Sequence, residues 1–414
     1  MRIIHTADWH IGQTLAGYGR ESEHRSVLRR LAAIAQEREA DALIVAGDIF
    51  DHQNPSGEAQ RLYYETLVAL RRARPDMAIV VTAGNHDAAG RLEAPHELLA
   101  SMNVHVVGNV RRVGGRIEAA RHLIALRDAK GEIVAEVLAV SHPTAGCLPP
   151  FGSMDTGGRL APIAEATRRL YRELIGGSGA GARGVPLIIT GHLHVAGCVE
   201  SEGAERRILV GGEHAVPPSI FPEPAAYVAL GHLHKAQKVG RENIRYSGSL
   251  LPLSASEHAY DHGVTLVTLG AGAPMIEHIA IERPVPFLRL PRTGYMGLGE
   301  LGDRLTALGL EKDLASEQQP FVQINLAREG SAALQRAEAD RLAAQFPVRV
   351  VEIRIEPVAV AAGDAGDAQA VRRLAELAPD ELFRQAFERT HGTAPDTGHL
   401  DAFHQAAADA DAEV

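Results

Sequence analysis

The chain has 414 residues, a length that predicts two or three domains, and its 45% hydrophobic and 23% charged content is ordinary for a water-soluble globular protein. It contains no apolar run of about 18 residues that could span a membrane, and its start, MRIIHTADWH, does not resemble a signal peptide. Cys147 and Cys198 form no CxxC pair, so we expect a reducing cytoplasm without a disulfide framework. The net charge of −10 is unusual for a nucleic-acid-binding protein, but acidic metal ligands and an acidic tail after Arg389 contribute to it, so charge does not decide the partner.

Short apolar runs alternate with amphipathic stretches in the N-terminal part. Leucine, isoleucine and valine recur at helical spacing between the runs, which predicts helices. This rhythm predicts a sheet covered by helices, with ligands at the carboxyl ends of its strands. The expected elements are strands at residues 2–6, 42–46 and 78–82, and helices at 22–39 and 56–74.

Further strands are expected at residues 133–140, 187–190 and 227–230, and residues 175–185 read as a glycine-rich loop. The pattern then changes. Residues 321–326 and 348–355 alternate like half-exposed strands around an amphipathic helix at 331–345, which predicts a small second α/β domain. An Ala/Gly/Asp linker follows at 358–369, and a short helix at 379–389 carries Leu382, Phe383 and Phe387 on one side.

Five of the expected strands end in a small residue and then a side chain that can bind metal or move a proton. Small residues let the backbone turn sharply, so that the next side chain points into the crevice. The candidates, in chain order, are Asp8, His10, Asp48, Asp51, Asn85, His86, Asp87, His192, His232 and His234.

The spacing of these residues predicts a two-metal centre. Asp8 and His10 are two positions apart and face the same side of an extended chain. Asp48 offers two oxygens that can bridge two ions, and Asn85 offers a neutral oxygen. Imidazoles would complete the coordination, and His192, His232 and His234 can supply them. Mixed nitrogen and oxygen ligands without thiolate favour manganese, iron or zinc over calcium.

Two ions about 3.5–4 Å apart clamp a phosphate and generate hydroxide for in-line attack. His86 is free of the metals and is expected to contact the phosphate and protonate the leaving oxygen. We expect Asp87 to orient the His86 imidazole and Asp51 to orient the metal ligands. His194 is expected to be a loop residue beside the site, and His5 a satisfied core residue.

The motifs DxH, GDxxD, GNHD, GH and GHxH, in that order, resemble the calcineurin-like metallophosphoesterase family. HTADWHIGQ (5–13), VAGDIFD (45–51) and ALGHLHKAQ (229–237) resemble its SbcD-type nuclease branch, and the resemblance covers about residues 1–285. It implies an α/β sandwich of two mixed sheets flanked by helices. It also implies two Mn²⁺, with Mg²⁺, Fe²⁺ or Zn²⁺ as alternatives, and a catalytic His86. One ion would be held by Asp8, His10, Asp48 and His234, the other by Asp48, Asn85, His192 and His232.

The resemblance also implies the domain plan: a nuclease domain at 1–282, a small α/β capping domain at 283–357, a linker at 358–375 and a C-terminal helical segment at 376–414. It implies a homodimer that binds DNA and joins an SbcC-type coiled-coil ATPase in a 2:2 assembly in the cytoplasm, at the nucleoid. The chain has no GxxxxGK[ST] motif, so the partner would handle ATP. Arg20, Arg61 and Lys235 are first guesses for DNA contacts.

The expected activity is a manganese-dependent double-strand exonuclease and single-strand or hairpin endonuclease in DNA repair and recombination. The main alternative is a phosphodiesterase for cyclic nucleotides or other small molecules, which would use the same metals. A non-catalytic scaffold is disfavoured because all seven expected ligands are present. A protein phosphatase is disfavoured because no arginine precedes GNHD to grip a phosphoprotein.

Overall fold

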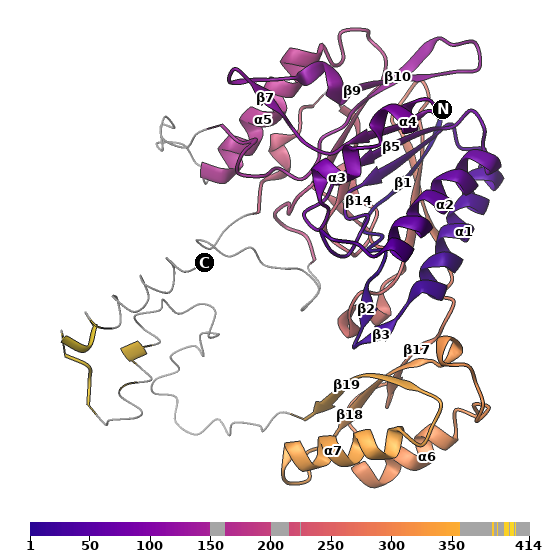
Figure 1. Ribbon diagram of the computed structural model, residues 1–414, viewed down its shortest axis with the longest axis vertical. Helices are drawn as coiled ribbons and strands as arrows, with labels where there is room; N and C mark the ends of the chain where they lie inside the picture. Colours follow the sequence, from indigo (N-terminus) through magenta and orange to yellow (C-terminus); the bar gives the residue numbers. More distant parts are fainter. Residues whose placement is uncertain are drawn as a thin grey trace. The chain divides into compact units, whose positions relative to one another are not determined.

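The computed structural model describes residues 1–149, 162–199, 215–223 and 225–356, and beyond these only residues 383–384, 387, 393–396, 398–400 and 402. The chain divides into two compact units, Met1–Glu356 and Pro357–Val414. The first unit contains two large sheets and a small one (Figure 1). In the described part of the chain, no helix is long and apolar enough to cross a membrane.

Six strands form the first sheet. Strands β1, β4, β5 and β6 run parallel, β15 runs antiparallel to β1, and β16 runs antiparallel to β15. Every residue of β4 and β5 is buried, as expected for parallel strands covered on both faces. The order across the sheet is β16 (Met275–Ala280), β15 (Gly263–Thr268), β1 (Arg2–Thr6), β4 (Ala42–Ala46), β5 (Ala78–Thr82) and β6 (Val104–Val107).

The second sheet also has six strands, of which β10, β11, β12 and β14 run parallel and the two edge strands are antiparallel. The prediction of two mixed sheets is therefore confirmed. The order is β13 (Gln237–Val239), β14 (Arg241–Tyr246), β12 (Ala225–Gly231), β11 (Leu187–His192), β10 (Ile133–Leu138) and β9 (Leu123–Arg127).

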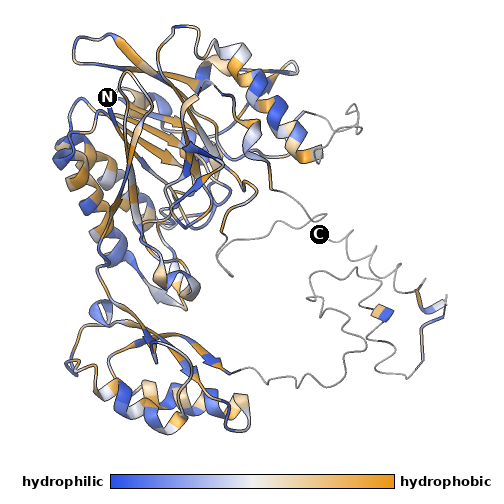
Figure 2. Cartoon of the chain, turned by 180° about the vertical axis from the view of Figure 1, so that it is seen from behind, coloured by the Kyte–Doolittle hydropathy of each residue, from blue (hydrophilic) through white to orange (hydrophobic). Residues whose placement is uncertain are grey.

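The two sheets pack face to face, and helices cover their outer faces (Figure 1). Because side chains alternate along a strand, Ile3 points between the sheets, where it joins Ile188 and Tyr227 of the second sheet. Ile4 points outward into the core under α1 (Glu21–Glu37) and α2 (Gly57–Ala73). On the other side α5 (Pro162–Ser178) covers the second sheet. Figure 2 shows the same division, with hydrophobic strands inside and hydrophilic residues on the outer helices.

Shorter elements connect the layers. They are the hairpins β2 (Thr14–Leu15) with β3 (Tyr18–Gly19) and β7 (Arg112–Val113) with β8 (Arg116–Ile117), the helices α3 (Ala89–Glu93) and α4 (His96–Ala100), and the 3-10 turns η1 (Ala119–His122), η3 (Pro218–Ile220) and η4 (Ala255–Ala259).

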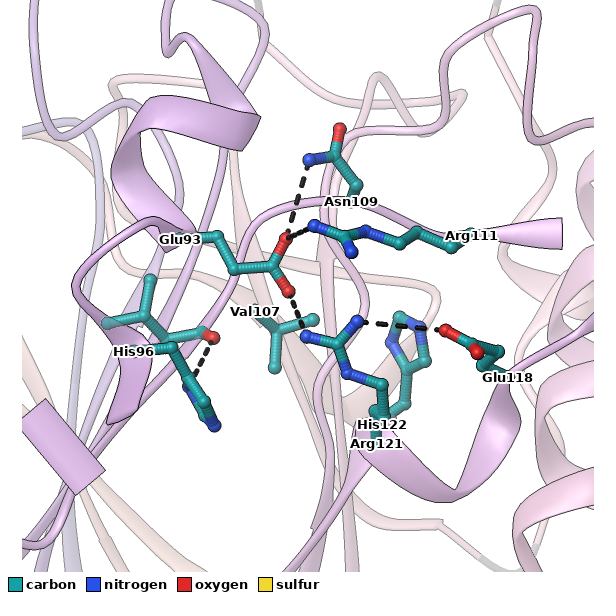
Figure 3. Close-up of a pocket in the computed structure, with 9 residues that line it drawn as sticks. Glu93, His96, Val107, Asn109, Arg111, Glu118, Arg121 and His122 are labelled. Carbon is teal, nitrogen blue, oxygen red and sulfur yellow. Dashed lines mark hydrogen bonds and ion pairs between the residues drawn. The ribbon is translucent and has the colours of Figure 1, made fainter. Parts of the chain in front are cut away.

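A charged cluster ties α3 to the segment after β6 (Figure 3). The buried carboxylate of Glu93 accepts hydrogen bonds from Arg121 at 2.6 Å, Arg111 at 3.2 Å and Asn109 at 3.4 Å. These residues line a cavity of about 90 Å³ that contains none of the candidate metal ligands. The cluster therefore ties α3, the helix that follows His86 in the chain, to the segment from Asn109 to Arg121.

A small three-stranded parallel sheet follows, with β18 (Phe321–Leu326) between β17 (Phe287–Leu290) and β19 (Arg349–Ile355). Residues of α7 (Ala332–Ala343) and α6 (Leu301–Thr306) share its apolar core. The 3-10 turns η5 (Leu298–Glu300) and η6 (Ser316–Gln318) complete it.

Three expectations are wrong. β18 is buried at every residue rather than half-exposed, because α6 and α7 cover one face while Phe321 on the other lies 3.7 Å below the Arg349 guanidinium. Residues 175–178 end α5 instead of opening a loop. Arg20 is 2% exposed, so it is not a surface DNA contact. Its guanidinium binds both oxygens of Glu23, at 3.2 and 3.1 Å.

The linker at 358–375 lies outside the described residues, as does most of the expected helix at 379–389. In the second unit Phe383, Arg384 and Phe387 are helical, and the rings of Phe383 and Phe387 lie 5.8 Å apart.

Candidate metal centre

The candidate ligands meet where the parallel strands of both sheets end. Asp8 and His10 follow β1, Asp48 follows β4, and Asn85 follows β5. From the second sheet, His192 is the last residue of β11, and His232 and His234 follow β12. The two sheets touch at this edge, where the ring nitrogen Nδ1 of His192 lies 2.8 Å from the carbonyl oxygen of Ala46. The structure thus brings together all seven expected ligands.

Two glycines of the motifs are required by close approach. A Cβ atom at Gly84 would overlap the Asp48 carboxylate, and one at Gly47 would overlap the His192 ring. Gly47 also has a φ of +90°, which favours glycine. The glycines of GD and GN therefore let two strand ends and a ring pack against one another.

The backbone is strained at the site. In the described part of the chain, seven residues other than glycine have a positive φ, and four of them are candidate ligands. Such conformations cost energy and persist where function requires them. The four are Asp8 at 52°, His10 at 46°, Asp48 at 50° and His232 at 102°.

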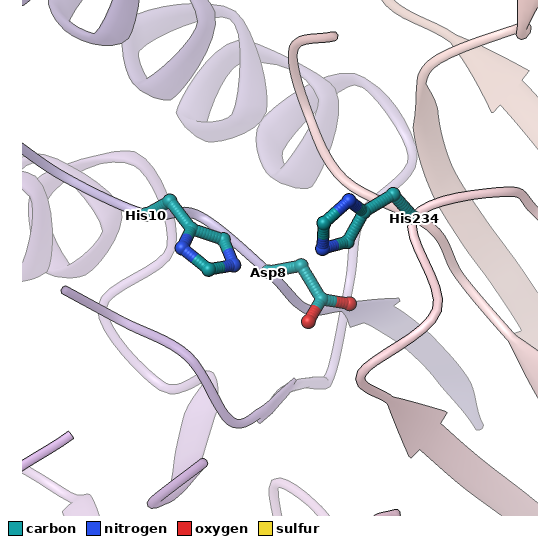
Figure 4. Close-up of side chains that lie close together, drawn as sticks. All are labelled: Asp8, His10 and His234. Atoms are coloured by element: carbon teal, nitrogen blue, oxygen red, sulfur yellow. The ribbon is translucent and has the colours of Figure 1, made fainter. Parts of the chain in front are cut away.

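Asp8, His10 and His234 form the first ligand group, which we name the carboxylate-backed group (Figure 4). Their ligand atoms lie within 4.8 Å of one another, and all three residues are buried. A second carboxylate backs each imidazole through Nδ1: Asp51 Oδ1 at 3.0 Å for His10 and Glu257 Oε1 at 2.8 Å for His234. The contact expected of Asp51 is present.

Asn85, His192 and His232 form the second group, which we name the amide-centred group. Oδ1 of Asn85 lies 3.0 Å from Nε2 of His192 and 3.0 Å from Nδ1 of His232. Atoms bound to one octahedral ion at about 2.1 Å are about 3 Å apart, so this spacing fits a shared cation. Asp48 lies between the groups, with Oδ2 3.2 Å from Nε2 of His192 and 3.5 Å from Nε2 of His10.

The chemistry of these atoms also fits a cation. Nε2 of His10 is buried and has no hydrogen-bond partner among the described residues. Burial lowers the pKa of His192, but the neighbouring Asp48 outweighs it and raises this pKa to about 9. Burial raises the pKa of Asp48, yet His192 and His10 hold it well below its usual value. A carboxylate that draws a proton onto a buried imidazole marks a place where a metal ion would replace that proton.

His86 lies at the rim of the carboxylate-backed group, with its ring centroid 4.9 Å from that of His10. Its Nδ1 lies 2.8 Å from the backbone oxygen of Asp51. The expectation that Asp87 orients this imidazole is wrong. Both Asp87 oxygens accept backbone N–H groups, from Gly84 at 2.8 Å, Phe50 at 3.0 Å and Ile49 at 3.1 Å, so Asp87 fixes the loops instead. Burial raises the pKa of Asp87 to about 6.

Three other histidines lie outside the two groups of candidate ligands. His194 belongs to none of the described groups of candidate ligands, and its ring lies 6.5 Å from that of His232. His5 is a buried core residue, as expected, with Nδ1 2.9 Å from the Tyr227 hydroxyl, but it is only half satisfied, because its buried Nε2 has no hydrogen-bond partner among the described residues. His142 was missed by the sequence analysis. It follows β10, a sixth strand end, and its Nδ1 lies 3.0 Å from the backbone oxygen of His192.

Glu257 was also missed, because it lies in η4, far from any strand end. The distance between Glu257 and His234 in the sequence gives no signal for their contact.

Comparison with known proteins agrees with this geometry. Residues 1–236 match the family described as calcineurin-like phosphoesterase, and residues 283–391 match the one described as type 5 capsule protein repressor C-terminal domain. The chain is 46% identical over 387 residues to the SbcD subunit of the nuclease SbcCD from Rhodobacter capsulatus, covering 94% of each protein. It is 31% identical to the SbcD subunit from Escherichia coli K12, covering 86% of this chain and 85% of the relative. The SbcD subunit of Bacillus subtilis 168 is 37% identical over 66% of this chain and 67% of its own. The chain therefore belongs to the calcineurin-like phosphoesterase family, in the group of the SbcD subunits of SbcCD nucleases.

Proposed function

We propose that the protein is a manganese-dependent DNA nuclease subunit that acts with an SbcC-type ATPase. It would degrade double-stranded ends as an exonuclease and cut single strands and hairpins as an endonuclease, in DNA repair and recombination. The observation that carries the proposal is the place of Asp48, whose carboxylate lies within 3.5 Å of a ligand nitrogen in each group. A carboxylate shared between two donor groups supports a pair of ions. Such a pair supplies an activated water and neutralises charge on a phosphoryl group.

The surrounding residues prepare this chemistry. Asp8, Asp48 and His192 are almost fully buried, so little water competes for them. His86 directs Nδ1 to the Asp51 carbonyl, which leaves Nε2 to contact the phosphate or the leaving oxygen. Oxygen and imidazole ligands without thiolate suit Mn²⁺, and Mg²⁺, Fe²⁺ or Zn²⁺ would compete for them.

The chain carries further support for the proposed assembly. Tyr64 and Val68, one turn apart on α2, are 40% and 39% exposed, and Leu98 on α4 is 69% exposed. We propose a homodimer, with the exposed pair Tyr64 and Val68 on α2 as its candidate contacts. We place the nuclease domain at 1–282, the capping domain at 283–357, the linker at 358–375 and an ATPase-binding helical segment at 376–414. The family match at 283–391 lies across the last three. A role on DNA would place the protein at the nucleoid in the cytoplasm.

The experiment is cleavage of end-labelled duplex and hairpin DNA by the purified chain, with Mn²⁺, Mg²⁺ or EDTA, alone and with an SbcC-type ATPase. The variant is His86→Ala. The matched control is His278→Ala, because His278 is an exposed histidine on β16. We expect manganese-dependent cleavage that His86→Ala loses and His278→Ala keeps.

A small phosphodiester, bis(p-nitrophenyl) phosphate, is assayed in parallel. Hydrolysis of this ester without DNA cleavage, even with the ATPase present, would favour the alternative of a small-molecule phosphodiesterase. No hydrolysis of either substrate would favour a scaffold.

A further inference from the structure

Glu257 is a buried carboxylate that the sequence motifs do not include. It is 0% exposed. Its Oε1 lies 2.8 Å from Nδ1 of His234, and its Oε2 accepts the backbone N–H of Leu253 at 2.7 Å. Among the described residues, no lysine or arginine forms an ion pair with it. A buried charge is costly unless it is paired and hydrogen-bonded, so the contact with His234 accounts for a charge in this position.

The backbone around Glu257 is fixed from both sides. Its own N–H donates to the carbonyl of Ser254 at 3.2 Å, and its carbonyl accepts from Tyr260 N–H at 2.9 Å. Nε2 of His262 lies 3.3 Å from the same carbonyl. The carboxylate therefore reaches His234 from a rigid turn.

The consequence for His234 is a fixed ring. With Nδ1 bonded to Glu257, only Nε2 is left to face Asp8 and His10, the other members of the carboxylate-backed group (Figure 4). We propose that Glu257 is a positioning residue that orients His234 as a metal ligand and strengthens metal binding at this group. Carboxylate–histidine–metal arrangements of this kind set the tautomer and raise the basicity of the ligand. The inference rests on the proposed two-metal function.

The amide-centred group has no equivalent among the described contacts. His192 directs Nδ1 to the backbone oxygen of Ala46, and His232 uses Nδ1 itself toward Asn85. Loss of the Glu257 charge should therefore weaken one of two metal positions and leave the other unchanged. A general loss of folding would weaken both.

The test is a titration of the full chain with Mn²⁺, followed by calorimetry and by tryptophan fluorescence. Trp9 is the single tryptophan of the sequence and stands between Asp8 and His10, so a paramagnetic ion bound there should quench it. For Glu257→Gln we expect roughly 10–100-fold weaker binding at one position and unchanged binding at the other. Excess Mn²⁺ should restore DNA cleavage.

The matched control is Glu136→Gln. Glu136 lies on β10 of the second sheet, is also 0% exposed, and is paired with Arg183 and with the N–H of Gly181. This variant removes a buried carboxylate away from the metals and should bind both ions like the wild type. If Glu257→Gln does not fold, Glu257→Asp replaces it, because the shorter side chain keeps the charge but cannot span Leu253 and His234.

Two unchanged binding steps in the folded variant would overturn the proposal, as would equal weakening of both positions. Failure of the proposed function has a different signature. In that case the wild type itself would not cleave DNA, whereas calorimetry would still report whether Glu257 controls one metal position.

Discussion

The two halves of the candidate metal centre use the same kind of scaffold but differ in charge. In the carboxylate-backed group, the candidate oxygen ligand is the charged Asp8 and both imidazoles are supported by carboxylates, from Asp51 and Glu257. In the amide-centred group the candidate oxygen ligand is the neutral Asn85, and His192 is supported by a backbone carbonyl. Asp48 serves both. We expect the first half to bind cations more tightly, because opposite charges attract strongly where water is excluded.

Each half also combines residues from both sheets. His234 joins Asp8 and His10 from across the sandwich, and His192 joins Asn85 in the same way. Neither half exists in one sheet alone. Both groups of candidate ligands therefore form when the two sheets pack together. The two groups differ in charge, and not in the order in which they form during folding.

The largest effect is expected from Asp48→Asn. The amide keeps the shape but removes the charge of the carboxylate that lies between the two halves, so we expect at least about 1000-fold slower DNA cleavage, or about 4 kcal/mol. Calorimetry should show both Mn²⁺ sites weakened. The exposed Asp128, which caps a turn through Lys130 N–H at 2.9 Å, provides the control as Asp128→Asn. Weakening of one site alone would mean that Asp48 does not bridge.

Manganese should stabilise the fold itself. A ligand that binds only the native state at 100 times its dissociation constant adds about 2.7 kcal/mol. We expect the melting temperature to rise with Mn²⁺ and fall with EDTA, in two concentration ranges of which the lower belongs to the carboxylate-backed group. Trp9 fluorescence should follow the lower range. If Trp9 is quenched only in the upper range of Mn²⁺ concentration, the amide-centred group is the one that binds Mn²⁺ more tightly.

Asn85→Asp would make the two halves more alike. Without metal, an added half-buried carboxylate near Asp48 should cost about 2 kcal/mol, because His192 offsets part of the charge. With Mn²⁺ the same carboxylate becomes a ligand, so the rise in melting temperature should exceed that of the wild type. Thermal unfolding with and without Mn²⁺ tests this. A smaller rise in melting temperature would show that the neutral amide suits this position better than a carboxylate does.

The candidate ligands were predictable because each lies at or just after the end of a strand that sequence periodicity reveals. Residues 2–6, 42–46 and 78–82 form strands with the expected bounds. A parallel sheet brings strand ends to one edge, so Asp8, Asp48 and Asn85 could be grouped without coordinates.

The supporting residues were not predictable by that route. Glu257 reaches His234 from a 3-10 turn, and Asp87 binds three backbone N–H groups instead of His86. Such contacts depend on how loops pack, which has no period in the sequence. Arg20 illustrates the same limit, because its burial depends on Glu23, Gln13 and the Pro252 carbonyl, which come together only in the folded chain.

The smallest effect is expected from Asp51→Asn. Asp51 supports His10 as Glu257 supports His234, but its side chain is 18% exposed and also lies 3.1 Å from Nε2 of His52. The amide oxygen of asparagine can still accept from Nδ1 of His10, and water already screens part of the lost charge. We therefore expect about 10-fold weaker Mn²⁺ binding at the carboxylate-backed group, at the lower end of the effect of supporting carboxylates. Mn²⁺ titration of Trp9 fluorescence measures it, with His52→Ala separating the contribution of the neighbouring ring. A loss larger than that of Glu257→Gln would mean that burial does not set the strength of the supporting carboxylate, and that the contact of His10 with the shared Asp48 matters more.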